Sequence, residues 1–351
     1  MIGKHEKHQL AIAWSGLPPY AAYCLRALVE AYSERITILG TKADVPHTGI
    51  ESIIGQEVVW LERKQQYRWA DLGLEVPSHF IHTGWAYPAF NSLGKEVRTQ
   101  GGRRYSMIDS IWYGRLKQYF GLLYFRLVYR KWFDAVLVPG KTGHKFCSML
   151  GMPDHRIFEG LYGANPDIFT HHMPLNKRPR RILFVGRLIE RKGILPLLEA
   201  ARQSVARRDG WEFVVVGAGP LERRLQSEPS ITVEPFAGPE KIAEWMRSSR
   251  FLVLPSVEEN WGVVIHEATL SGCGLILAKG IGAAEDLLQS NENGLLVQSG
   301  EVESLSQSFE RLSKWDASKL QRCEQISCNL AAKFGPSRFV TSVLTLLEAP
   351  H

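Results

Sequence analysis

Two acidic residues, Glu259 and Glu267, bracket a short apolar run in the stretch "EENWGVVIHE" at 258–267. Gly262 permits close backbone approach, and the residues after it predict a helix. The N–H groups at positions 261–264 would begin that helix without intrahelical partners, so they attract negative charge. Carboxylates accept hydrogen bonds from hydroxyl groups, so the two acids suit a ribose and a sugar ring beside a phosphate. An amphipathic helix with one satisfied buried acid is the open alternative.

Two cations follow an expected strand in the stretch "FVGRLIERKG". Gly186 ends the strand, Arg187 comes next, and Lys192 stands at the start of the following helix. Both side chains can converge on one polyanion, and each charge-assisted hydrogen bond to phosphate contributes about 1.5–3 kcal/mol. A second strand-to-helix turn, "VVVGAGPLERRL", contains Gly217, which lets backbone approach a ligand closely. These features favour a site for a phosphorylated ligand, with a solvated pair of surface cations as the alternative.

Two known phosphate-binding fingerprints are incomplete. A dinucleotide fingerprint needs a glycine three places after Gly219, and Glu222 stands there, so a dehydrogenase is rejected. The stretch "VLVPGKTG" ends in the Gly-Lys-Thr of a P-loop at Lys141 and Thr142, but Ala135 replaces the required first glycine. We expect an ordinary turn from strand to helix there.

Short β-branched runs alternate with helical patterns, which predicts parallel α/β units. In the first half the expected strands are residues 9–14, 35–40, 57–62, 79–83, 103–109 and 134–140. After the polar segment 164–180 they are residues 181–186, 211–217, 231–236, 251–256, 274–278 and 294–297. We expect two Rossmann-like, doubly wound domains that face a central cleft, where the carboxyl ends of their strands bind ligands.

The predicted domain boundaries follow from that polar segment. We expect an N-terminal domain at 1–170, a linker at 171–180 and a C-terminal domain at 181–334. Residues 335–351 predict a C-terminal helix, for which packing back on the N-terminal domain is one arrangement. The five cysteines form no CxxC pair, the N-terminal apolar stretch is too interrupted for a signal peptide, and no run of about 18 apolar residues occurs. These features predict a cytoplasmic protein.

The stretches "GRLIERKG", "GAGP" and "PSVEENWGVVIHEATLSGCG" together resemble the donor-binding domain of retaining glycosyltransferases of family 4, among the glycosyl transferases group 1. That family has the GT-B fold, and the resemblance covers residues 180–300. It implies that the domain at 181–334 binds the donor and that the N-terminal domain at 1–170 binds the acceptor. It implies that Arg187 and Lys192 bind the diphosphate of a nucleotide-sugar donor, and that Glu267 binds its ribose. It also implies that Glu259, the first acid of an E-x7-E motif, contacts the transferred sugar. The backbone that would face the sugar and diphosphate belongs to Asn260, Trp261, Gly262 and Val263.

The first half resembles the family less closely. The stretch "WSGLPPYAAYCLRAL" takes the place of the family's glycine-rich loop and keeps one of its two glycines, Gly16, whose backbone role at the donor carries over. His82 stands where many members place a histidine near the donor sugar, and Asp109 ends the next expected strand. Glu259, His82 and Asp109 are the candidate catalytic residues, the last two for orienting an acceptor hydroxyl. A local hydrogen-bonding role for His82 and Asp109 is the alternative.

The mechanism implied by the resemblance is transfer with retention, in which the acceptor attacks from the face that the diphosphate leaves. Positive side chains and helix amides would stabilise the leaving group, so we expect no metal and no cofactor besides the donor substrate. The expected partners are a nucleotide sugar and a hydroxyl acceptor, either a sugar or a lipid-linked sugar, in bacterial polysaccharide or glycolipid assembly. The alternatives are a nucleotide-sugar epimerase and a basic nucleic-acid-binding protein. The latter lacks any recognisable recognition motif.

Basic charge is concentrated in the first half. Residues 95–145 contain eleven Lys or Arg against three acids, an excess of eight, whereas the whole chain has a net charge of +6. Within them, residues 111–133 contain five bases, no acid and many aromatics. Trp112, Leu116, Phe120, Leu123 and Leu127 recur at helical spacing, so we expect part of this face to pack on the N-terminal sheet. Two interpretations stay open: an ordinary crossover helix, or a helix that touches an anionic membrane at its inner, cytoplasmic face.

Overall fold

The computed structural model describes residues 9–43, 49–85 and 87–350 and divides the chain into two compact units. Unit 1 combines the chain up to Gly163 with the segment from Gly335 onward, and unit 2 spans Ala164–Phe334. The predicted boundary differs from this division, because the segment 164–180 belongs to unit 2. The guanidinium of Arg178 is buried and donates to the carbonyl oxygens of Ser249 and Ser271, which fixes that segment to unit 2.

Unit 1 is built on a seven-stranded parallel sheet with the order β3-β2-β1-β4-β5-β6-β7. The strands are β1 (Leu10–Trp14), β2 (Ile36–Gly40), β3 (Val59–Trp60), β4 (His79–Thr83), β5 (Arg103–Met107), β6 (Ala135–Val138) and β7 (Ile157–Glu159). All five residues of β1 are buried, as expected for a central strand of a parallel sheet that is covered on both faces.

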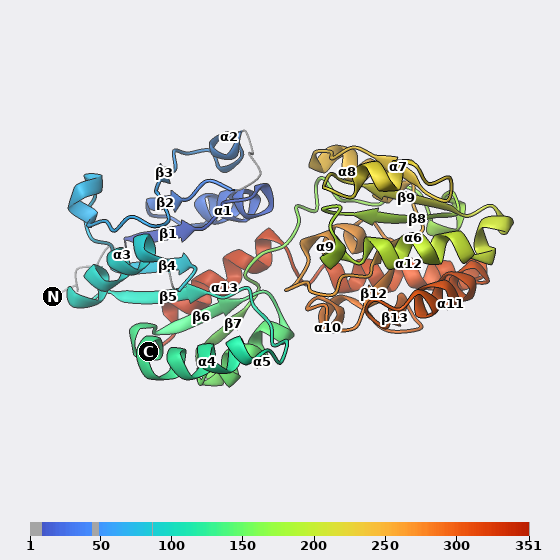
Figure 1. The fold of residues 1–351 in the computed structure, drawn as a ribbon. Helices are drawn as coiled ribbons and strands as arrows, with labels where there is room; N and C mark the ends of the chain where they lie inside the picture. Colours follow the sequence, from blue (N-terminus) through green and yellow to red (C-terminus); the bar gives the residue numbers. More distant parts are fainter. Residues whose placement is uncertain (1–8, 44–48, 86, 351) are drawn as a thin grey trace. The chain divides into compact units, whose positions relative to one another are not determined.

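The helices of unit 1 come from both ends of the chain. They are α1 (Pro19–Ala31), α2 (Ile50–Ile54), α3 (Pro88–Thr99), α4 (Leu116–Tyr124), α5 (Lys141–Met149) and α13 (Pro336–Glu348). Helix α13, drawn in red, packs beside α1 although all of unit 2 separates them in the sequence (Figure 1). Ser342 Oγ on α13 also donates a hydrogen bond to the carbonyl oxygen of Glu159 at 2.5 Å. The last helix of the chain is therefore part of unit 1.

Unit 2 has a six-stranded parallel sheet with the order β10-β9-β8-β11-β12-β13. Its strands are β8 (Arg181–Val185), β9 (Glu212–Val216), β10 (Thr232–Glu234), β11 (Phe251–Leu254), β12 (Gly274–Ala278) and β13 (Gly294–Val297). Its helices are α6 (Ile194–Gln203), α7 (Glu222–Gln226), α8 (Pro239–Arg247), α9 (Val263–Leu270), α10 (Ala284–Leu287), α11 (Val302–Ser313) and α12 (Ala317–Ala331), which flank the sheet (Figure 1).

Each strand expected from the sequence contains a strand of the structure, so the α/β class with two doubly wound sheets is confirmed. The sequence analysis missed β7, a strand of three residues at the edge of the first sheet. The interpretation of the N-terminal stretch as no signal peptide falls partly on residues 1–8, which lie outside the described residues. No helix within the described ranges has both the length and the apolar composition needed to cross a bilayer.

The segment 111–133 folds differently from the expectation. Helix α4 continues into a π-helical turn, η2 (Phe125–Tyr129), and a 3₁₀ turn, η3 (Arg130–Trp132). Of the positions expected to pack on the sheet, Trp112 is half-buried and packs against the core. The other four lie outside: Leu116, Phe120, Leu123 and Leu127 are 78%, 75%, 57% and 69% exposed. Phe125 enters the core in their place, stacked on Phe133 with ring centroids 6.2 Å apart. No residue of α4 is fully buried, and within it the half-buried Leu122, rather than the expected positions, packs against the core.

Candidate functional site

The candidate residues of unit 2 follow neighbouring strands. Arg187 comes two residues after β8, Gly217 directly follows β9, and the loop 255–262 follows β11. These strands lie in the order β9-β8-β11, and the chain order reverses between β8 and β11. Doubly wound sheets bind ligands outside the carboxyl ends of their strands at such a reversal. The residues predicted to bind the diphosphate and the sugar therefore follow strands at the switch point of unit 2.

Lys192 is positioned by a turn that only glycine can make. It ends the 3₁₀ turn η6 (Glu190–Lys192), and Gly193 follows with φ of 70°. A Cβ on Gly193 would lie 2.1 Å from the carbonyl oxygen of Pro255, so a larger residue would displace the backbone after β11. The Val257 N–H also donates to the Arg191 carbonyl at 2.9 Å. The two loops therefore pack backbone against backbone.

Across this loop contact, Lys192 Nζ pairs with Glu259 Oε2. Their side chains are 15% and 18% exposed, so the pair is largely withdrawn from water but open on one side. A weaker pair joins Arg191 to Glu258 at 3.8 Å. The residue expected to bind diphosphate and the residue expected to bind the transferred sugar are thus each other's partners in this structure.

Arg187 supplies the second cation of the site. Its side chain is exposed, and no hydrogen bond or ion pair involves its guanidinium within the described ranges. Gly217, on the neighbouring turn, is needed for a structural reason, because a Cβ there would lie 1.9 Å from the carbonyl oxygen of Gly186. Arg187 is therefore available to an anion, whereas Gly217 mainly allows the two turns to approach each other.

The start of α9 presents backbone donors. Gly262 caps the helix with φ of 87°, in the left-handed region. The loop before it is held from behind, since Trp261 is buried and its Nε1 donates to Asp286 Oδ2 at 3.2 Å. No described residue accepts a hydrogen bond from the N–H of Val263 or Val264. Two aligned amides with the positive end of the helix dipole can hold an anion.

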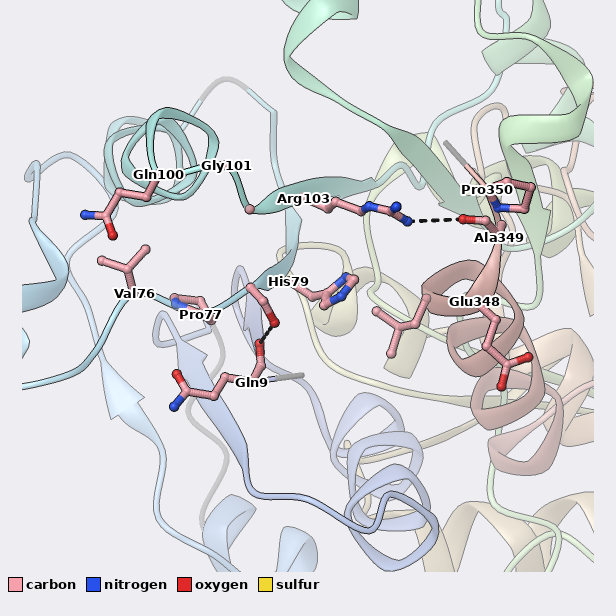
Figure 2. A pocket seen from close by; sticks show the side chains of 13 residues that line it. Gln9, Val76, Pro77, His79, Gln100, Gly101, Arg103, Glu348, Ala349 and Pro350 are labelled. Atoms are coloured by element: carbon pink, nitrogen blue, oxygen red, sulfur yellow. Dashed lines mark hydrogen bonds between the residues drawn. The ribbon is translucent and has the colours of Figure 1, made fainter. Parts of the chain in front are cut away.

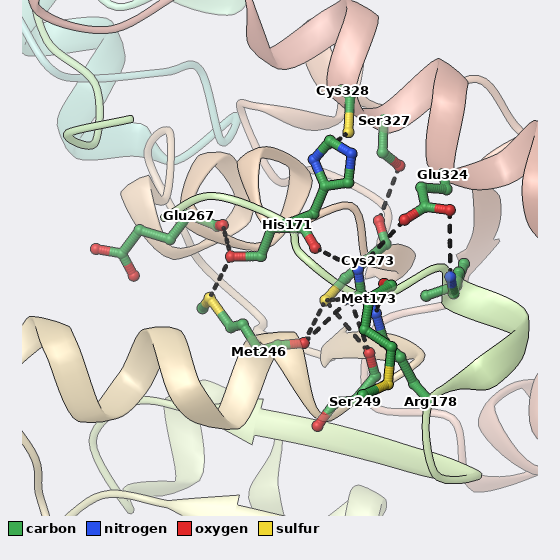
Figure 3. A network of polar contacts seen from close by, with 12 residues as sticks. His171, Met173, Arg178, Met246, Ser249, Glu267, Cys273, Glu324, Ser327 and Cys328 are labelled. Carbon is green, nitrogen blue, oxygen red and sulfur yellow. Dashed lines mark hydrogen bonds and ion pairs between the residues drawn. The ribbon is translucent and has the colours of Figure 1, made fainter. Parts of the chain in front are cut away.

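Glu267 lies one turn further along α9, and its carboxylate points away from the polar cluster around Cys273 and Arg178 (Figure 3). Within the part of the chain that the structure describes, its carboxylate has no hydrogen bond or ion pair. Removal of water from most of the carboxyl raises the pKa of Glu267 to about 8. A ligand that donates hydroxyl hydrogen bonds would stabilise the ionised form.

His266, next to Glu267, is a residue that the sequence analysis missed. The imidazole is buried: Nδ1 accepts from the Ala164 N–H at 2.9 Å, and Nε2 donates to the Ala331 carbonyl at 2.9 Å. Burial lowers the pKa of His266 to about 4, so the ring is neutral and its tautomer is fixed by these two bonds. His266 therefore fastens α9 to both ends of unit 2. Its position inside the E-x7-E motif was the available signal.

The candidates of unit 1 follow or end the three central strands β1, β4 and β5. Gly16 follows β1, and its N–H donates to Thr41 Oγ1 at 2.8 Å. His82 belongs to β4, but it is fully buried, with Nε2 accepting from Arg104 Nε at 2.9 Å and Nδ1 bonded to the Thr83 carbonyl. Burial, then the charge of Arg104, holds the pKa of His82 well below its usual value near 6.5. Both ring nitrogens are occupied, so His82 serves the core and offers nothing to a sugar here.

Asp109 and the Figure 2 cavity lie at different ends of the sheet in unit 1. Asp109 stands two residues after the carboxyl end of β5 and is partly buried. A cavity of about 750 Å³ lies at the amino ends of β4 and β5, where Arg103 donates to the Ala349 carbonyl (Figure 2). None of the predicted site residues lines that cavity. In neither unit do three or more His, Cys, Asp or Glu of the described residues gather in a way that could hold a metal.

Comparisons with known proteins agree with the sequence resemblance. Residues 179–314 match the family model of glycosyl transferases group 1. The chain is 28% identical over 188 residues to the amylovoran biosynthesis glycosyltransferase AmsK of Erwinia amylovora, which covers 50% of this chain and 46% of AmsK. It is 22% identical over 312 residues to the alpha-D-kanosaminyltransferase of Streptomyces kanamyceticus, which covers 81% and 80% of the two chains. The matched part spans about half the length of most of these curated relatives.

Among solved structures, Alr3699/HepE of Anabaena in complex with UDP and glucose has a TM-score of 0.74 at 16% identity. The match covers 98% of this chain and 100% of that one. At this identity the likeness shows the fold, which is GT-B. The resemblance to glycosyl transferases group 1 is confirmed, and these matches lend no support to an epimerase or a nucleic-acid-binding protein.

Proposed function

We propose that this chain, which has the GT-B fold and a glycosyl transferases group 1 match at residues 179–314, is a retaining, metal-independent glycosyltransferase. It would move a sugar from a nucleotide-diphosphate sugar to a hydroxyl group of an acceptor. The observation that carries the proposal is the Lys192–Glu259 pair at one strand reversal, with Arg187 on the turn after β8 and Glu259 on the loop that leads into α9. Cations and helix amides at such a reversal suit a diphosphate.

In this arrangement each part of the nucleotide sugar has a binding partner on the protein. The diphosphate contacts Arg187, Lys192 and the amides of Val263 and Val264, while the ribose hydroxyls donate to Glu267. As the bond from the sugar to the diphosphate breaks, negative charge grows on the departing oxygen, and these groups stabilise it. The acceptor oxygen bonds to the sugar from the same face, and its proton passes to the departing phosphate. The two cations take the place that a metal would otherwise fill.

The donor nucleotide can be ranked for testing. Alr3699/HepE was solved with UDP, with UDP and glucose, and with UDP-glucose. We therefore propose a uridine nucleotide first, with GDP- and ADP-sugars as the comparison. AmsK is named for amylovoran biosynthesis and two other relatives for colanic acid biosynthesis, which supports a role in bacterial polysaccharide or glycolipid assembly. Glu259 would contact the transferred sugar, and Asp109 is the remaining candidate to orient the acceptor.

The acceptor side of the proposal includes a membrane. The exposed apolar residues of α4 and η2 stand beside five basic residues and no acid in 111–133. Such a surface can lie in a bilayer interface and is attracted to acidic lipids. We propose a cytoplasmic protein that reaches the inner membrane face through this surface, where a lipid-linked sugar would be its acceptor. The competing description is an ordinary surface helix whose basic residues face solvent and touch no membrane.

A transfer assay tests the proposal. The purified chain is incubated with UDP-, GDP- or ADP-sugars and a simple sugar acceptor in EDTA, and released nucleoside diphosphate is measured together with the anomeric configuration of the product. We expect release with one donor class, retained configuration and no effect of the chelator. Inverted product, or activity lost in EDTA and restored by magnesium or manganese, would contradict the mechanism.

A further inference from the structure

A second cavity of unit 1 lies along α3, away from the candidate residues of the transfer site. It has a volume of about 1,130 Å³ and lies between α3 and the segment formed by η2 and η3. Residues of both sides line it, among them Asn91 and Lys95 of α3 and Tyr129 and Trp132 opposite. None of the candidate transfer residues lines this groove.

Arg104 enters the groove from β5 and is only 2% exposed. Its partners are neutral: Nε donates to His82 at 2.9 Å, Nη2 donates to Asn91 Oδ1, and the guanidinium lies 4.5 Å from the ring centroid of Phe133. No carboxylate of the described residues pairs with its side chain. Burial lowers the pKa of Arg104 to about 10, which leaves it a cation at neutral pH. Buried charges are normally paired, so this one calls for an anion.

Helix α3 is built to admit that side chain. Gly94 lies in the middle of the helix, where glycine costs about 1 kcal/mol relative to alanine. A Cβ on Gly94 would lie 2.2 Å from Arg104 Nε and 2.7 Å from its Cζ. The sequence therefore gives up helix stability at one position, and the space gained holds the guanidinium at the groove. This is a formed site rather than a chance surface arrangement.

The other charges of the groove leave Arg104 unbalanced. Arg68 and Lys95 add positive charge, and Asp71 and Glu96 add negative charge. The two acids are already engaged, since Asp71 accepts from the Arg68 N–H and Glu96 accepts from the Trp69 N–H.

The Arg98–Asp134 ion pair near Arg104 leaves no carboxylate of its own free for the Arg104 side chain. Arg98 and Asp134 pair at 2.9 Å, and Asp134 also accepts the backbone N–H of Arg104. With three cations against two acids, the lining of the groove keeps one uncompensated positive charge.

We propose that this groove is a phosphate-binding site, in which Arg104 and Lys95 hold the oxygens of a phosphomonoester. An arginine fork matches phosphate geometry, and a lysine adds a mobile charge. Val128, on the groove wall, is 36% exposed and follows Leu127 on the exposed apolar surface of η2. The phosphate can therefore come from a lipid headgroup or from a soluble phosphate, and the site is independent of the proposed transfer reaction.

Thermal unfolding of the full chain in phosphate and in chloride, at equal ionic strength and pH, tests the site. At about ten times the dissociation constant, phosphate should raise the Tm of the wild type by about 2 °C or more. Compared in an Arg187→Ala background, which weakens the proposed donor site, Lys95→Gln should lose at least half of the remaining rise, and Arg104→Met should lose all of it. If Arg104→Met does not fold by circular dichroism, Gly94→Ala, which displaces the guanidinium, takes its place.

Two controls separate this site from others. Lys117→Gln removes an exposed base of α4 outside the groove, and Arg187→Ala removes a cation of the proposed donor site. Lys117→Gln should keep the full phosphate effect, whereas any part that Arg187→Ala alone removes belongs to the proposed donor site and not to the groove. No rise in the wild type would overturn the proposal, as would a rise that survives Lys95→Gln and Arg104→Met but disappears in Arg187→Ala.

Flotation with phosphatidylcholine vesicles then identifies the source of the phosphate. Vesicles with phosphatidic acid, a phosphomonoester, are compared with vesicles of equal charge that contain phosphatidylglycerol. A preference for phosphatidic acid that Lys95→Gln abolishes and Lys117→Gln preserves supports a lipid headgroup. Equal binding to both, together with phosphate stabilisation in solution, supports a soluble phosphate.

Discussion

Lys192 Nζ forms an ion pair with Glu259 Oε2, which joins the turn after β8 to the loop after β11. In the proposed site the same ammonium binds the donor diphosphate, so phosphate and carboxylate compete for one cation. The pair thereby balances the charges of both side chains while they are largely withdrawn from water. Entry of the donor would release Glu259 to the sugar at the moment that Lys192 turns to the diphosphate.

Glu259→Gln tests this competition. Removal of the carboxylate frees Lys192, so the affinity for UDP should hold or rise by up to about fivefold, the range expected for a partly exposed pair. Transfer from a UDP-sugar should fall, because the contact to the sugar is weakened. Calorimetric titration gives the affinity and product release gives the rate. If the variant binds UDP as poorly as Lys192→Ala does, the pair positions the lysine rather than competing for it.

Glu267→Gln separates ligand binding from stability. The variant should bind UDP at least tenfold more weakly, because two hydroxyl bonds to a charged acceptor are lost. The folded pKa of about 8 lies above the unfolded value near 4.5, so the folded state holds the proton more tightly. The stability of the wild type should therefore fall as pH rises from about 4.5 through 8. The side chain is partly exposed, which reduces the size of this effect.

Urea unfolding at pH 6 and pH 9 checks the sign of that linkage. Glu267→Gln should already exceed the wild type at pH 6, where part of the loss has occurred, and should exceed it by more at pH 9. A variant that is destabilised at both values, with unchanged UDP affinity per folded molecule, would make Glu267 a structural residue.

His266→Ala should destabilise unit 2. It removes a buried ring and leaves the Ala164 N–H and the Ala331 carbonyl without partners, at a cost of about 2–4 kcal/mol. His171→Ala is the matched control, because that side chain is exposed and should change the free energy of unfolding by less than about 0.5 kcal/mol. Urea unfolding at pH 7 measures both.

The pH dependence of the free energies of unfolding of the wild type and His266→Ala is a second check. His266 has a folded pKa near 4, below its usual 6.5, so its contribution is present above pH 6.5 and declines as pH falls toward 4. The gap between wild type and His266→Ala should narrow over that range. A gap that stays constant would mean that the imidazole is not held neutral.

The sequence was most informative where one pattern repeats along many residues. Buried β-branched runs predicted the sheets, and the stretch 258–267 predicted that Glu259 lies on a loop and Glu267 about one turn inside the helix that follows, as in the structure. Tertiary effects were not readable in the same way. Helical spacing predicted a buried face at Leu116, Phe120 and Leu127, which the structure instead exposes. Arg104 occupies both the groove and a ring nitrogen of His82, which no local pattern around His82 could indicate.

Neutralising Arg126, Arg130 and Lys131 to Gln should weaken binding to anionic vesicles at least tenfold. Each base near a charged surface contributes about 1 kcal/mol, and added salt should reduce binding in the wild type. Leu116→Ser with Phe120→Ser should weaken binding at any salt concentration, because exposed apolar area is lost. Vesicle sedimentation measures both effects.

The matched control neutralises three bases elsewhere, at Arg223, Arg224 and Lys314 of unit 2. That variant should sediment with vesicles as the wild type does. No binding of the wild type to anionic vesicles at low salt would leave α4 an ordinary surface helix and the acceptor a soluble molecule.

The most direct test of the donor site is calorimetric titration of UDP, GDP and ADP into the wild type, Arg187→Ala and Lys192→Ala in the presence of EDTA. Each cation contributes about 1.5–3 kcal/mol to a phosphate contact, so each variant should bind the preferred nucleotide at least tenfold more weakly while keeping its circular dichroism spectrum. Saturable binding in the wild type that is weakened in both variants is the predicted result. Failure of all three nucleotides to bind, or equal binding in the variants, would contradict the assignment of unit 2 as the nucleotide-sugar site.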